Sequence, residues 1–524
     1  MECASLGPIL RLRKPPVMPH PRVKIDRRGL PHWVYWMAGV VVLFEPASWA
    51  IAGIVDRSDP SAWMLLGCTG ISVVAYWLAL RWMRVSVVPF IFVFLFLVSY
   101  PARVPLVEQN KDLYTVSGGH NSVGNFEFTS AAYAPYYVVS LIGLAGLLVG
   151  SSLTISLYRR SRPGFDWGGN RWLRHLVGPC AVWMLFTAGI SVICYELNIG
   201  LAGIDQPVLP MHLTGCLNFL RMFVAPVAGW FLFGLAYERR ADRLVFGLLV
   251  FATLHGIASI YFTLSKAGLM YAILPLMAYL VMRAPRRALT WKIVSGSAML
   301  MLLFLPLTYF GAMVLRNEVY FGQEDSRAEA FRRMVADHVG ESGGFIKLLR
   351  GTIAAVAGRV TGGDELMAVT SGRPYPDSTV WGLVAGRAAE PDYGGPEMFL
   401  EIFHVQLIHE DGKFSGKAFG LFAGLFLSHK YWLVFIGSGI FAGLVVWLEQ
   451  YALLHVSRSV ACGFAFWIGL NVWESTFDNL KFYPLILFGM LVAIQFIKRQ
   501  RRRYAAAGPL EMQRPPSDDA LLTT

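Results

Sequence analysis

The sequence is poor in the features that mark secreted, disulfide-stabilised or metal-binding proteins. It has six cysteines in 524 residues, and five of them lie in or at the ends of apolar runs. None falls between residues 316 and 417, so we expect neither a disulfide framework nor a cysteine-based metal site in that stretch. The first 32 residues carry seven lysines and arginines but no uncharged apolar core of signal-peptide length. We therefore expect a basic tail rather than a cleaved leader.

Other absences exclude further classes. The pair Gly362-Gly363 is not followed by GK[ST], so it does not form a phosphate-binding P-loop. The chain has no internal repeat, and no inverted pair of apolar segments broken by glycine or proline of the kind that many transporters have. No cluster of acidic residues suggests a metal cage, and we expect no cofactor.

What the chain has is apolar sequence, with 55% hydrophobic residues arranged in runs long enough to cross a bilayer. These runs predict an all-α polytopic membrane protein with about twelve spans. The expected spans are 33–54, 63–82, 86–101, 132–156, 176–195, 213–236, 244–263, 267–282, 293–315, about 428–450, 459–475 and 482–497.

The net charge of +12 follows the positive-inside pattern when both termini are cytoplasmic. The segments then assigned to the cytoplasm carry 28 lysines and arginines, against 6 in the short loops on the other side. This bias removes the need for a nucleic-acid partner and places the stretch 316–417 outside the cytoplasm. The loop 102–131 falls on the same side, and we expect it to lie beside that stretch.

These assignments divide the chain into five parts. We expect a cytoplasmic tail (1–32), nine spans (33–315), an extracytoplasmic loop domain (316–417), an interfacial or re-entrant helix followed by three spans (418–498), and a disordered cytoplasmic tail (499–524).

Charges within spans or at their outer ends are the first candidates for function, because such charges are costly in a bilayer. Arg221 lies in the middle of an apolar run, whereas Lys266 and Arg316 follow the seventh and ninth spans. The alternative is structural: Lys266 and Arg316 reach to the interface, and Arg221 pairs with a buried carboxylate such as Glu45.

The loop domain contains further arginines that could bind phosphate. Residues 344–369 are typical of an amphipathic helix with a break at Gly362-Gly363, and of the arginines before that break we favour Arg359. Arg373 and Arg387 lie in turn-rich stretches. Each arginine alone is more typical of a solvated surface; the set is what indicates a binding role.

The segment PEMFLEIFHVQLIHE places Glu397, Glu401 and His404 on one helix face at spacings of four and three residues. Glu401 or His404 could act there as a general base. A solvated polar face is the alternative. The Glu401 to His404 spacing also occurs in di-iron bundles, but no second copy accompanies it, so we predict no metal site.

Three stretches give the chain a resemblance to a known family: SKAGLMYAILPL (265–276), RVTGGDELMAV with the later LVAGRAAEPDYG, and KAFGLFAGLFLSHKYWLVFIGSGIFAGLVV (417–446). With the many spans and one long late loop, the chain resembles the Wzy-type polysaccharide (O-antigen) polymerases. The family commonly has a proline before the arginine where this chain has Gly386-Arg387.

The resemblance implies a metal-independent glycosyltransferase of the bacterial inner membrane, similar to the C-type glycosyltransferases, with its long loop in the periplasm. Its substrate would be an undecaprenyl-diphosphate-linked glycan within membrane lipid, and its partners a chain-length regulator and a flippase. Lys266, Arg221, Arg316, Arg359, Arg373 and Arg387 would bind substrate, and Glu401 or His404 would be the base. An O-antigen ligase is the first alternative, and a transporter or flippase the second.

Overall fold

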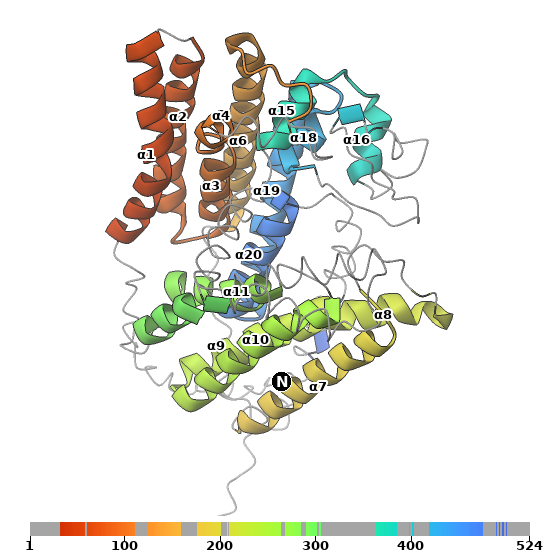
Figure 1. Ribbon diagram of the computed structural model, residues 1–524. Helices are drawn as coiled ribbons and strands as arrows, with labels where there is room; N and C mark the ends of the chain where they lie inside the picture. The colour runs from red at the N-terminus through yellow and green to blue at the C-terminus, as the bar shows by residue number, and fades with distance from the viewer. Residues whose placement is uncertain are drawn as a thin grey trace, which may run out of the picture.

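The computed structural model describes residues 32–57, 60–109, 123–158, 175–200, 209–263, 268–284, 290–300, 363–384 and 419–474. It also describes residues 207, 303–304, 398, 401–402, 489, 492, 495–496 and 499. Within these residues every regular element is a helix (Figure 1). The expected all-helical class is confirmed for this part of the chain.

Eight helical stretches in the described part are long and apolar enough to cross a bilayer. They are α1 (His32–Arg57), α2 (Pro60–Trp82), α3 (Val88–Ser99) with α4 (Arg103–Gln109), α6 (Ser130–Tyr158), α7 (Val177–Glu196), the run from η2 (Pro210–His212) through α8 (Leu213–Phe219) and the π-helical turn η3 (Leu220–Val224) to α9 (Ala225–Glu238), α10 (Asp242–Thr263) and α19 (Tyr431–His455). The chain is therefore a multi-pass helical membrane protein.

The remaining predicted spans have two outcomes. The spans expected at 267–282 and 459–475 correspond to α11 (Gly268–Met282) and α20 (Arg458–Glu474), whose apolar stretches are shorter. Those expected at 293–315 and 482–497 lie largely outside the described residues and stay predictions.

The helices form two groups that cross at a steep angle (Figure 1). The first group contains α1, α2, α3, α6 and α19, and the second contains α7, the α8–α9 run, α10 and α11. Helix α20 contacts members of both groups, packing on α19 and α3 in one and on α9 and α11 in the other.

Glycines bring the backbones of α6 and α19 together. A Cβ atom on Gly146 would lie 2.3 Å from the Phe435 carbonyl oxygen, and one on Gly150 would lie 1.9 Å from that of Gly439. Only glycine allows such an approach, which is how small residues hold helices together where lipid removes the hydrophobic driving force.

At one end of the bundle, a buried carboxylate links helices of the first group to the residue that follows α11 of the second group. Glu449 of α19 is 0% exposed; it accepts hydrogen bonds from the Ser86 hydroxyl and the Val87 amide, the latter at 2.9 Å, and pairs with Arg283 at 3.2 Å. The positive-inside pattern assigns the loops that carry Ser86 and Arg283 to one side of the membrane. The structure places both loops at the same end of the bundle.

The described part of the loop domain lies at the other end of α6 and α19, where α15 (Gly363–Ser371), α16 (Asp377–Val384) and α18 (Leu421–Phe426) gather (Figure 1). Arg103, which follows α3, donates from Nε to Asp364 Oδ1 at 2.7 Å and from its terminal nitrogen to Oδ2 at 2.5 Å. This contact confirms that the 102–131 loop lies beside the loop domain. A Cβ on Gly363 would lie 2.3 Å from the Ser99 carbonyl, so glycine lets α15 begin against the bundle. The helix expected before Gly363 lies outside the described residues and stays a prediction.

Of the two alternatives expected for 418–430, the described residues 419–430 disagree with an interfacial helix, and a re-entrant helix stays a prediction. Its helical part, α18, has six residues, and all six are buried by α19, α6, α15, α16 and α20. A helix lying on the bilayer surface would leave one face exposed to lipid.

Candidate functional site

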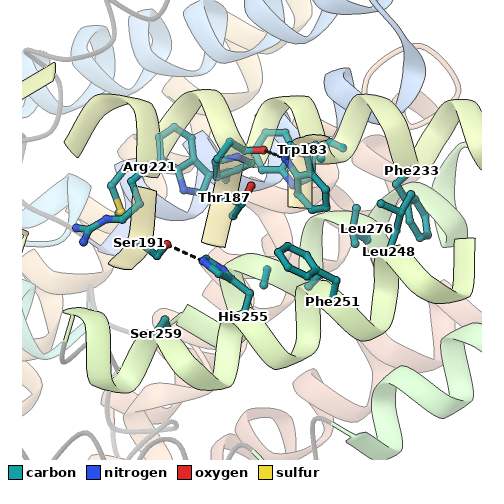
Figure 2. A pocket seen from close by; sticks show the side chains of 18 of the residues that line it. Trp183, Thr187, Ser191, Arg221, Phe233, Leu248, Phe251, His255, Ser259 and Leu276 are labelled. Carbon is teal, nitrogen blue, oxygen red and sulfur yellow. Dashed lines mark hydrogen bonds between the residues drawn. The ribbon is translucent and has the colours of Figure 1, made fainter. Parts of the chain in front are cut away.

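A pocket of about 320 Å³ opens within the second group of helices. Its walls come from α7, the α8–α9 run, α10 and α11, and Trp467 of α20, the helix that contacts both groups, also lines it. Figure 2 shows polar side chains at one end of the pocket and apolar side chains at the other. The volume is at the lower end of the range of small-molecule sites.

Arg221 is the charged residue of this pocket, and local backbone features hold it there. It lies in the π-helical turn Leu220–Val224, an interruption of regular helix that occurs often at functional sites. Its guanidinium donates to the Ile199 carbonyl at 3.0 Å, to the Gly200 carbonyl at 3.4 Å and to Asn218 Oδ1 at 3.0 Å. Gly200 has φ +74°, and a Cβ there would lie 1.8 Å from a guanidinium nitrogen, so glycine is required at this position.

The charge of Arg221 has no carboxylate partner among the described residues. The side chain is only 6% exposed, and its Nε has no hydrogen-bond partner in the described part of the chain. The alternative in which Arg221 pairs with Glu45 is wrong, because Glu45 lies on an exposed face of α1 and the partners of Arg221 are carbonyl and amide oxygens. A buried guanidinium without a counter-ion is costly and favours an anionic ligand.

Uncharged polar groups continue the polar end of the pocket along α7 and α10. Ser191 Oγ and His255 Nε2 are 2.9 Å apart and form a hydrogen bond between the two helices (Figure 2). Thr187, one turn from Ser191 on α7, is 4% exposed, and its hydroxyl has no partner among the described residues. Ser259, one turn from His255 on α10, also lines the pocket. Thr187, Ser191, His255 and Ser259 are hereafter the α7–α10 stripe.

The opposite end of the pocket is apolar. Its walls there carry Trp183, Phe251, Phe233, Leu248 and Leu276 (Figure 2). The indole N–H of Trp183 is satisfied by the Ala225 carbonyl at 2.7 Å, so the ring presents apolar surface to the cavity. An anion-attracting end joined to an apolar end fits an amphiphile with an anionic head group.

Two sequence-predicted residues meet outside this pocket. Arg373 and Glu401 form an ion pair, with Nε to Oε1 at 2.7 Å and the terminal nitrogen to Oε2 at 2.8 Å. The Tyr375 hydroxyl also donates to Oε2, at 2.6 Å. Burial and then the neighbouring Glu401 raise the pKa of Tyr375 to about 12, so this phenol stays a donor at neutral pH. A phosphate ligand for Arg373, or a sugar hydroxyl for Glu401, would have to compete with this pair.

The other predicted site residues lie outside the described residues. These are Lys266, Arg316, Arg359, Arg387 and His404, and their roles stay predictions. Of the predicted phosphate-binding residues, the structure places Arg221 in a pocket and Arg373 in an exposed ion pair, and it does not bring these two together.

Sequence reasoning missed the α7–α10 stripe. The signal was available, since Thr187 and Ser191 are four residues apart and so are Phe251, His255 and Ser259, which places each set on one helix face. Hydroxyls in apolar helices are common, however, because they can bond to their own backbone. The interhelical pair of Ser191 with His255 becomes visible only once α7 and α10 are placed side by side.

Two further findings concern metal binding by the described residues and the similarity of the chain to known proteins. In the part of the chain that the structure describes, no three His, Cys, Asp or Glu side chains gather closely enough to hold a metal ion. Comparison of the chain with protein-family models, with curated proteins and with solved structures gives no match.

Proposed function

We propose that this chain is a membrane glycosyltransferase that polymerises a polysaccharide. It transfers a growing glycan from a polyprenyl diphosphate to a lipid-linked repeat unit. The observation that carries the proposal is Arg221, a buried cation with no carboxylate partner among the described residues, at the polar end of a pocket whose other end is apolar. A polyprenyl diphosphate has the same division, since its head is anionic and its chain is hydrocarbon.

The position of Arg221 along its helix supports a donor presented from the non-cytoplasmic side. At the far end of the α8–α9 run, Glu238 accepts a hydrogen bond from Tyr279 at 3.4 Å, close to the loop of Arg283 that the charge pattern assigns to the cytoplasm. Arg221 precedes Glu238 by 17 residues, about 25 Å of helix. We propose that the polar end of the pocket lies toward the opposite, non-cytoplasmic side, and that this side is the periplasm of a cell with an inner membrane.

The chemistry requires a bond exchange at the anomeric carbon of the donor sugar. The acceptor hydroxyl forms a bond to this carbon, the bond to the diphosphate oxygen breaks, and the hydroxyl proton passes to a base. Negative charge grows on the leaving diphosphate, and a guanidinium can offset it through two parallel N–H···O bonds. Glu401 and His404 remain our candidates for the base, and Lys266, Arg316, Arg359 and Arg387 for further contacts to the phosphates. Glu401 is paired with Arg373 outside the pocket, so as the base it would have to leave that pair and approach a donor bound at Arg221.

Two alternatives draw support from the same pocket. An O-antigen ligase would use the same donor and differ only in its acceptor, the lipid A core. A transporter or flippase is favoured by the π-helical turn at Arg221, since interrupted helices near a buried charge also form translocation sites.

The surface polysaccharide ladder separates these functions. A strain lacking the chain is complemented with the wild type, with Arg221→Ala, and with Arg84→Ala as a control that removes an exposed arginine far from the pocket. Polymerase function predicts that the deletion and Arg221→Ala leave cores capped with a single repeat unit, while Arg84→Ala restores the ladder. Loss of even the single cap, with long lipid-linked chains accumulating, would identify a ligase; an unchanged ladder in the deletion strain would exclude both.

A further inference from the structure

The α7–α10 stripe is a second set of polar groups in the pocket, separate from the groups that bond to Arg221. Ser191 and His255 bond to each other at 2.9 Å, and Ser259 donates to its own helix at Gly256, at 2.6 Å. The Thr187 hydroxyl is 4% exposed and has no partner among the described residues, although it lines the cavity. A buried hydroxyl without a partner costs free energy, which a ligand acceptor atom would recover.

We propose that the α7–α10 stripe is the uncharged half of a head-group site, and that it makes the pocket select a diphosphate over a monophosphate. This inference rests on the proposed function and names residues that determine its donor specificity. Arg221 binds one phosphate through its Nε–H, which has no partner among the described residues, and through the terminal N–H that its three protein hydrogen bonds leave over. Thr187 and the Ser191–His255 pair then donate hydrogen bonds to the oxygens of the second phosphate.

The positions of the residues support this division. In Figure 2, Arg221, Ser191, His255 and Ser259 lie toward the same end of the pocket, with Thr187 between them and the apolar residues. His255 stacks on Phe251 with ring centres 5.9 Å apart, which fixes the ring plane and leaves one edge toward Ser191. Neutral donors suit the second phosphate because they add hydrogen bonds without adding another buried positive charge beside Arg221.

The test measures binding of two short amphiphiles, farnesyl diphosphate and farnesyl monophosphate, to the full chain in lipid nanodiscs by titration calorimetry. We expect the wild type to bind the diphosphate about tenfold or more tightly, because hydrogen bonds to charged groups are the strong ones. Thr187→Val and His255→Phe each reduce diphosphate affinity about tenfold and leave monophosphate affinity within about twofold. His255→Gln, which keeps a side-chain donor, retains most of the preference.

Two controls separate binding from folding. Thr187→Val removes a hydroxyl that has no partner among the described residues, so a purely structural role predicts unchanged or higher stability and unchanged specificity. Thr253→Val changes a buried threonine of the same α10 that does not line the pocket, and it should leave both affinities unchanged.

The outcomes also separate this inference from the proposed function. If the wild type binds both amphiphiles equally, or if the stripe variants keep the wild-type ratio, the stripe does not select a diphosphate. Loss of both affinities in Arg221→Ala would then still support the donor site. If the wild type binds neither amphiphile, the donor site itself is refuted, and the specificity assigned to the stripe is refuted with it.

Discussion

Arg103 and Arg221 are both almost completely buried, at 2% and 6% exposed, but they lie in regions built differently. Arg103 is held by both oxygens of Asp364 where the first group of helices meets α15. Arg221 lies in the pocket of the second group and contacts only carbonyl and amide oxygens among the described residues. Arg283 resembles Arg103, since it pairs with the buried Glu449. The paired arginines join segments distant in the sequence, whereas Arg221, which has no carboxylate partner in the described part of the chain, faces a cavity.

This difference predicts that the two arginines contribute unequally to the free energy of unfolding. The larger loss should come from Arg103→Ala. Removing one partner of a buried pair leaves Asp364 as an uncompensated charge, which costs about 3–5 kcal/mol. Arg221→Ala leaves no carboxylate orphaned among the described residues and loses hydrogen bonds only to uncharged oxygens, so it should cost less, about 1–3 kcal/mol. Chemical unfolding in detergent, followed by tryptophan fluorescence, compares the two.

The double variant Arg103→Met with Asp364→Leu tests whether the loss of stability comes from the uncompensated charge of Asp364. Replacing both charges with apolar side chains removes the orphan and should recover most of the lost stability. A double variant as unstable as Arg103→Ala would show that the pair contributes through its shape or its other contacts, and the contrast between the two arginines would lose its electrostatic basis.

For the rate of glycan transfer, in contrast to stability, Arg221 should be the more important of the two arginines. Arg221→Ala should lower the rate of glycan transfer by about 10²–10³, the effect of removing one donor that stabilises transition-state charge. Arg221→Lys should lower it less, because lysine keeps the charge and loses the two-pronged contact. The assay uses purified protein, a lipid-linked repeat unit and gel separation of products. Wild-type rates in both variants would assign Arg221 to structure alone.

The sequence predicted the helical class well because apolar runs of bilayer length have few alternatives. It also singled out Arg221, since a charge in the middle of such a run is costly wherever the run packs. The example given in the structural alternative, a pair with Glu45, was wrong: the guanidinium donates instead to the carbonyls of 199–200 and to the side-chain oxygen of Asn218.

The sequence predicted that the 102–131 loop lies beside the loop domain, but not which side chains of distant segments meet. The pair of Arg103 with Asp364 spans 261 positions, and nothing local marks either residue as half of a buried pair. The link between Arg373 and Glu401 similarly depends on how a turn-rich stretch and a helical segment pack on each other. Periodicity reports which face a residue occupies, whereas the element that covers that face is set by tertiary packing.

A smaller effect on stability should distinguish the close glycine packing of α6 in the first group from the looser surroundings of a glycine in α7 of the second. Gly150→Ala in α6 introduces a Cβ 1.9 Å from the Gly439 carbonyl, which forces α6 and α19 apart and should cost about 1–3 kcal/mol. Gly189→Ala in α7 is the matched control, because no atom lies within 4 Å of its added Cβ. Thermal unfolding of both variants in the same detergent gives the comparison. Equal losses would mean that the close contact relaxes without cost.

The smallest effect should come from a charge pair at the exposed edge of the first group. Asp377 of α16 accepts a hydrogen bond from Lys430 at 2.5 Å, and this contact holds the pKa of Asp377 below its usual value. Because the folded pKa is lowered, the pair stabilises the fold fully above the unfolded pKa of about 4 and loses this effect as the pH falls through the lower folded pKa. Asp377→Asn should therefore lower the unfolding temperature slightly at pH 7 and by less at pH 3. Since both side chains are largely solvated, 0.5 M salt should remove most of the difference at pH 7; a difference that persists in salt would show that Asp377 acts through burial, as Arg103 does, rather than through a screened surface contact.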